Sequence, residues 1–172
     1  MPLADELLEH SSRLIAAPAV ADIDCRRAVS ACYYAVFHLL SAAVGAQVSP
    51  PTPPGMSGRI QRLLGHRSMR DAMAPFSDPN KWNTFSTNLG IPCVFSPDLA
   101  VIGQAYAELQ DARHIADYDA VDAKGTVGLL WATDCLDEAK LAFDAWNRVK
   151  STDEARLFLA TLIFGVKWAN RT

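Results

Sequence analysis

The chain has little charge and no basic excess. Charged residues make up only 20% of its 172 residues, below the typical share of about 25%, and 50% are hydrophobic. A disordered chain needs low hydrophobicity and high net charge, so this composition predicts a folded core in a single domain, residues 1–172. The formal net charge is -3, whereas tight non-specific duplex binding calls for a strong positive charge. Any nucleic-acid contact must therefore be made by a local patch.

The sequence also lacks the patterns of metal sites and disulfide frameworks. None of the four cysteines belongs to a Cys-x-x-Cys pair, and no histidine follows them at zinc-finger spacing. No paired histidines or carboxylates stand at metal-ligand spacing, so we expect no metal and no other cofactor. The spacing instead predicts buried, reduced thiols at Cys25, Cys32, Cys93 and Cys135.

No secretory signal is visible at the N-terminus, which predicts a cytoplasmic protein. One apolar run, Ala28–Gly45, is barely long enough to cross a membrane, and it contains a histidine, two serines and two tyrosines. Arginines flank it at one end only. We therefore expect a buried helix here and no membrane partner.

No strand-like alternation of apolar and polar residues persists, but helical periodicity does. The helix over 22–46 is apolar nearly all round and should be central. Ser151 and Glu154 have the spacing of a capping box for a last, accessory helix. These patterns predict an all-α bundle with up to six helices. The expected helices span about 3–17, 22–46, 57–64 (perhaps resuming over 68–73), 98–118, 127–149 and 151–166.

Two stretches are predicted to be loops. Ser49–Gly55 reads SPPTPPG, and its prolines lack the backbone donor that a helix needs. Pro75–Ser96 is punctuated by prolines and a glycine but contains several large aromatic residues, which must pack on something. Long loops in compact domains are often functional. Ser96 and Pro97 are typical of a helix start, as N-cap and first helical residue.

The helix that begins there carries an arginine on its apolar face. Its apolar residues step by three and four, and the next step is Arg113, which needs hydrogen-bond acceptors or a polar cleft at that position. Asp117 follows one turn later, so one interpretation is a structural ion pair. The other is a cluster with His114 and Tyr118 that faces a phosphate-bearing ligand, which the planar fork of arginine suits. The apolar series is Leu99, Ile102, Tyr106 and Leu109.

Three blocks of the sequence together resemble HEPN-domain proteins. They are CRRAVSACYYAVFHLLSAAVG (residues 25–45), GHRSM (65–69) and RHIADYDA (113–120), in the family's order. The resemblance implies an up-and-down bundle of four core helices plus extra helices, with the core at about 3–149. It also implies a homodimer and, as in many members, a ribonuclease toxin paired with a nucleotidyltransferase-like antitoxin.

The chain departs from the motif of the catalytic members, which is an arginine, four to six residues and then a histidine. Here His114 follows Arg113 at once, and Tyr118, Asp119 and Ala120 occupy the positions of the expected histidine. Neighbouring residues on a helix point about 100° apart, so His114 cannot supply the same geometry. Arg59 and His66 formally match the spacing but lie on a different predicted helix, and we interpret that match as chance.

If RNA cleavage occurs without metal, Arg113 would stabilise the developing phosphorane, and His114 or His66 would take the 2′-hydroxyl proton. Tyr118 would orient the phosphate or stack on a base. The binding candidates are His66, Arg67, Tyr34 and Arg59. The arginines around His66 form the only basic cluster; it is either a phosphate-binding patch or simply a solvated helix face.

Three functions follow as hypotheses. The first is an RNA-targeting effector or toxin of a two-gene system, with metal-independent ribonuclease activity. The second is a non-catalytic HEPN-like module that binds a nucleotide or a protein partner, which the missing histidine favours. The third is a helical adaptor without a ligand. The apolar surplus further predicts a dimer with Arg113 near its seam.

Overall fold

A computed structural model describes residues 2–47, 55–90, 95–121 and 125–165. Eight helices hold 82% of these residues, and no strand occurs among them, so the prediction of an all-α protein is confirmed. The proline-rich stretch lies almost entirely outside the described residues. The helices are α1 (Leu3–Ile15), α2 (Asp22–Gln47), α3 (Met56–Gln61), α4 (His66–Ser77), α5 (Pro79–Leu89), α6 (Pro97–Tyr118), α7 (Leu129–Val149) and α8 (Asp153–Phe164).

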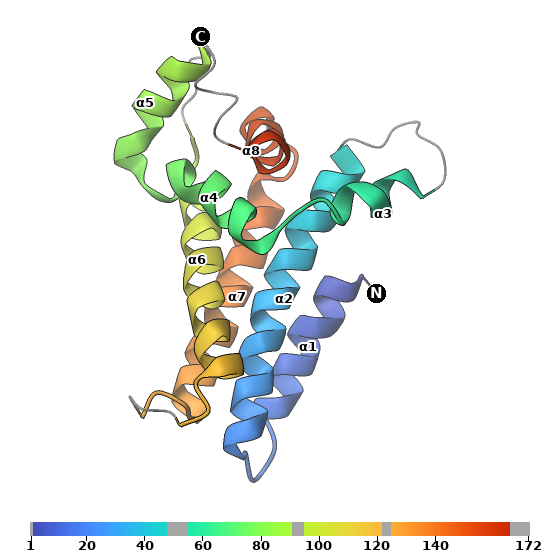
Figure 1. Cartoon of the computed structure of the whole chain (residues 1–172), viewed down its shortest axis with the longest axis vertical. Helices are drawn as coiled ribbons and strands as arrows, with labels where there is room; N and C mark the ends of the chain where they lie inside the picture. Colours follow the sequence, from blue (N-terminus) through green and yellow to red (C-terminus); the bar gives the residue numbers. More distant parts are fainter. Residues whose placement is uncertain (1, 48–54, 91–94, 122–124, 166–172) are drawn as a thin grey trace. The chain divides into compact units, whose positions relative to one another are not determined.

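The chain forms two compact units, each built from two segments of sequence. The first unit contains residues 1–39 and 105–143, and the second contains 40–104 and 144–172. In the first unit, α1 and the start of α2 form a helical hairpin, joined by the turn at the bottom of Figure 1. In the second unit, α4 packs against both α5 and α8.

Helix α2 is the buried apolar helix that the sequence predicts. It is long and apolar enough to cross a membrane by length and composition, but 67% of its most apolar window is buried inside the protein. Among its core residues, Val29, Tyr33 and Leu40 have no exposed surface. Such burial is what the core helix of a globular fold requires, and it is compatible with a soluble protein.

The prediction of a loop over 75–96 is wrong, because most of that stretch is helical. Helix α4 continues through Pro75 to Ser77, and α5 follows directly. The Asp78 side chain caps α5 by accepting from the backbone N–H of Asn80 at 3.0 Å, with a proline at the first helical position. Gly90 ends α5 in the left-handed conformation, at φ 66°. The same prolines and glycine that suggested a loop are therefore the start and stop signals of a helix.

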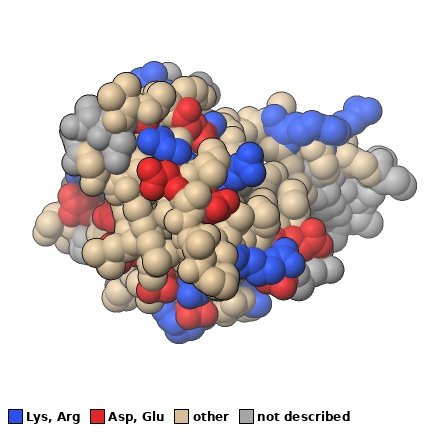
Figure 2. Space-filling view, turned by 90° about the horizontal axis from the view of Figure 1, so that it is seen from below, with Lys and Arg blue, Asp and Glu red and all other residues tan. Residues whose placement is uncertain are grey.

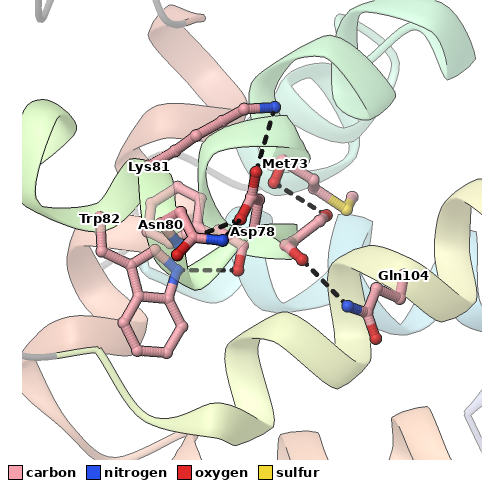
Figure 3. A network of polar contacts seen from close by, with 8 residues as sticks. Met73, Asp78, Asn80, Lys81, Trp82 and Gln104 are labelled. Carbon is pink, nitrogen blue, oxygen red and sulfur yellow. Dashed lines mark hydrogen bonds and ion pairs between the residues drawn. The ribbon is translucent and has the colours of Figure 1, made fainter.

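The aromatic residues of that stretch do pack into the core of the second unit. The Phe76 ring lies 5.0 to 5.1 Å, centroid to centroid, from the rings of Phe85, Phe95 and Phe158. The Trp82 indole N–H donates to the Phe76 carbonyl at 3.0 Å. Figure 3 draws this bond as the dashed line from the Trp82 ring nitrogen. This cluster fixes α5 on α4 and α8, so the prediction that these side chains are packed is confirmed.

The helix caps are partly as predicted. Ser96 accepts from the backbone N–H of Asp98 at 3.2 Å, which confirms it as a cap of α6. The prediction of a capping box at Ser151 and Glu154 is wrong, because Thr152 caps α8 by accepting from the Ala155 N–H at 3.2 Å. Glu154 instead accepts from the backbone N–H of Ser96, so a tertiary contact replaces the local one.

Candidate functional site

Arg113 lies where the periodicity of α6 predicts, within the first unit. The four apolar residues of its stripe are at most 1% exposed, and the Arg113 side chain is 20% exposed. Its Nε donates to Oδ2 of Asp117 at 2.7 Å. The structural interpretation of this pair, an ion pair one turn apart on one helix face, therefore describes the geometry.

Two tyrosines of α2 cover the guanidinium of Arg113. The guanidinium carbon lies 5.6 Å from the ring centroid of Tyr33 and 5.1 Å from that of Tyr34, within cation–π distance. Tyr33 is fully buried, its hydroxyl lies 3.0 Å from that of Tyr106, and burial raises its pKa. Burial alone would lower the pKa of Arg113, but Tyr34 and Asp117 hold it above its usual value. Arg113 thus stays charged, with its Nε paired to Asp117 and its guanidinium against two tyrosine rings.

The last turn of α6 is bound to α2 by two further polar side chains. Ser30 donates its hydroxyl to Oδ1 of Asp117 at 2.6 Å, so both carboxylate oxygens of Asp117 are engaged. Arg26 donates to the carbonyls of Ile115 and Ala116, at 3.3 and 3.0 Å. The last carbonyls of a helix lack partners within it, and Arg26 supplies one for Ala116; the Ile115 carbonyl also accepts from the backbone N–H of Asp119.

Tyr118 lies close enough to Arg113 to help raise the pKa of Arg113, but Tyr118 and His114 line a different hollow from Asp117. Their rings are 5.0 Å apart, and Tyr118 is 66% exposed. Both line an open hollow of about 400 Å³ together with Ile115, Asp119 and Thr126. The structure thus divides the four candidate catalytic residues into two pairs, because residues four apart share a helix face and adjacent residues do not.

A second hollow lies between α1, α2 and the last turn of α6; we call it the α1–α2 groove. It has a volume of about 470 Å³ and contains Tyr34 and Asp117, two of the predicted residues. Its other polar residues were missed as site residues, although the spacing of three and four along α2 puts most of them on one face. The lining residues are Leu7, His10, Ile23, Arg26, Arg27, Ser30, Ala31, Tyr34, Ala116 and Asp117.

The remaining binding candidates belong to the second unit. Arg59 lies on α3, and His66 and Arg67 form the start of α4. Both arginines are exposed, and His66 is half-buried. The face of the molecule in Figure 2 shows basic and acidic side chains interspersed.

The cysteines offer no reactive thiolate among the described residues. Cys25, Cys32 and Cys135 are buried and unbridged, as predicted, whereas Cys93 lies outside the described residues. Burial raises the pKa of Cys32 to about 11 and that of Cys135 to about 12. In the described part of the chain, no group of three or more histidine, cysteine or acidic side chains is arranged to hold a metal ion.

Comparisons with known proteins do not identify the chain. No family model, curated protein or solved structure matches it. The class that fold and site define is therefore an all-α protein with a partly basic groove.

Proposed function

We propose that this chain is a HEPN-like helical module that acts by binding its ligand rather than by cutting RNA. In this proposal it is the cytoplasmic effector half of a two-gene system, with a nucleotidyltransferase-like antitoxin as its partner. The observation that carries the proposal is the engagement of Arg113: Nε bonds to Asp117, and the guanidinium lies against Tyr33 and Tyr34.

Metal-independent RNA cleavage needs two groups at one phosphate. A base must take the 2′-hydroxyl proton, and a cation must stabilise the phosphorane. Arg113 lines neither the α1–α2 groove nor the hollow of His114 and Tyr118. The hollow that contains His114 is lined by no arginine or lysine among the described residues. The absence of a cation beside His114 supports binding over cleavage by the predicted cluster.

A ribonuclease assay without metal tests the proposal. The wild type and the double variant Arg113→Ala/Tyr118→Phe are incubated with end-labelled RNA in the presence of EDTA. We expect no cleavage by either protein. Cleavage by the wild type that the double variant lacks would overturn the proposal. The two-gene part is tested separately by the neighbouring reading frame, which should encode a small nucleotidyltransferase-like protein.

A ribonuclease is the second candidate, and one observation favours it. The rings of His114 and Tyr118 lie together in an open hollow large enough for a nucleotide. There His114 would act as the base and Tyr118 would orient the phosphate. A His114→Ala variant that loses RNA cleavage while keeping its fold, as circular dichroism would show, would establish this function.

A further inference from the structure

The α1–α2 groove combines basic side chains with an apolar floor. Arg26 and Arg27 come from α2, and His10 comes from α1. Leu7 and Ile23 supply apolar surface, and Ile23 is 52% exposed. A concave site with apolar walls and a few converging polar groups is typical of small-molecule binding, and a volume of about 470 Å³ suits a ligand of nucleotide size.

The groove keeps a positive charge despite its one carboxylate. Among the described residues, Asp117 is the only acidic one that lines it, and both oxygens of Asp117 are engaged, by Arg113 and by Ser30. The ion pair with Arg113 neutralises this carboxylate. The charges of Arg26 and Arg27 are therefore left uncompensated within the lining.

The two arginines differ in how they are held. Arg26 is fixed by its two bonds from Nη1 to the end of α6, which leave its Nε and Nη2 donors for a ligand. Arg27 is exposed and makes no hydrogen bond or ion pair with any described residue. One preorganised and one free guanidinium in the same groove are suited to binding an anion, since each presents a planar fork of donors.

We propose that the α1–α2 groove binds a phosphate-bearing small molecule. Arg27 and the remaining donors of Arg26 hold the phosphate, and His10 adds a further polar contact. Ile23, Leu7 and the Tyr34 ring contact the uncharged part of the ligand. The proposal rests on the proposed function, because it supplies the site through which a binding module would act.

Isothermal titration with inorganic phosphate, pyrophosphate and AMP tests the site. We expect all three to bind to the wild type, and Arg27→Ala to weaken each by about 10-fold or more, the usual effect of losing a charge-assisted contact. The matched control is Arg13→Ala on α1, an exposed arginine outside the groove that pairs with Glu9, and it should bind like the wild type. Ile23→Ala should weaken AMP alone, which separates recognition of the organic part from recognition of phosphate.

The outcomes separate the two proposals. No binding of any probe, or equal affinity in wild type and Arg27→Ala, would overturn the groove as a phosphate site. Equal effects of Arg27→Ala and Arg13→Ala would show only general electrostatic attraction and would also overturn it. RNA cleavage by a protein whose phosphate binding depends on Arg27 would overturn the proposed function and leave the groove standing.

Discussion

At the scale of single residues, the fold accommodates a charged side chain on the core-facing stripe of α6 by surrounding it with structural contacts. Arg113 is acceptable there because Asp117 accepts its Nε proton and two tyrosine rings cover its guanidinium. Periodicity alone was enough to place Arg113 and its pair at the edge of the buried stripe. The tyrosine contacts were harder to foresee, because α2 lies about 80 residues earlier and only the tertiary fold brings it to Arg113.

His38 is predicted to make the stability of the protein depend on pH. Burial lowers the pKa of His38, so the unfolded state binds the proton more readily than the folded state. Its contribution is therefore present above the unfolded pKa of about 6.5 and is lost as the pH falls. We expect the thermal midpoint to drop between about pH 6.5 and 5, and to drop less in His38→Gln. A pH series of melting curves tests this, and parallel curves for the two proteins would contradict it.

A side chain at Gly103 of α6 is predicted to displace the Ser77 hydroxyl. A Cβ there would overlap Oγ of Ser77, whose hydroxyl donates to the Met73 carbonyl at 3.2 Å. Gly103→Ala should therefore lower the free energy of unfolding by about 1–3 kcal/mol, as overpacking does. The control is Gly58→Ala on α3, where nothing lies within 4 Å and the change should be neutral or stabilising. Denaturant unfolding measures both, and a neutral Gly103→Ala would contradict the close approach.

At the scale of elements, α5 is the helix that the sequence analysis predicted to be a loop. Asn and Thr are weak helix formers, and Pro79 and Gly90 are as typical of a loop as of the two ends of a helix. The helix is stabilised by tertiary packing, since Trp82 and Phe85 contact the aromatic cluster around Phe76. The long apolar helices were predictable because the spacing of their apolar residues follows their buried face, whereas α5 depends on contacts outside its own segment.

The cap at Asp78 is the local element that sets the start of α5. Its carboxylate accepts from the N–H and Nδ2 of Asn80 and pairs with Lys81 at 3.6 Å, a network visible in Figure 3. Asp78→Ala should destabilise the start of α5 and speed amide exchange in α5. Asn83→Ala, on the same helix but outside this network, is the control. Exchange measured by mass spectrometry decides, and unchanged protection of α5 would contradict the role of the cap.

At the scale of the whole molecule, the buried core accounts for part of the high apolar content. Much of the apolar content is buried in α2 and in the aromatic cluster of the second unit. Several large apolar side chains still lie on the surface; Leu63, Val121 and Leu130 are 83%, 85% and 78% exposed. Composition predicted a folded all-α protein. It could not predict the α1–α2 groove, which forms only when three helices meet.

The whole molecule is predicted to form a dimer. A second copy would cover part of the exposed apolar surface, with Arg113 near the seam. Sedimentation equilibrium should give twice the chain mass of 18.7 kDa at micromolar concentration. A monomer at every concentration tested would contradict this prediction.

The central claim is that Arg113 stabilises the fold and has no catalytic role. Its most direct test is the free energy of unfolding of Arg113→Met in denaturant, with Arg27→Met as the control. The account predicts a loss of about 1–2 kcal/mol for Arg113→Met, from the ion pair and the ring contacts. Arg27 has no partner among the described residues, and its variant should stay within about 0.5 kcal/mol of the wild type. Unchanged or increased stability of Arg113→Met, the usual signature of a residue retained for function, would contradict the account.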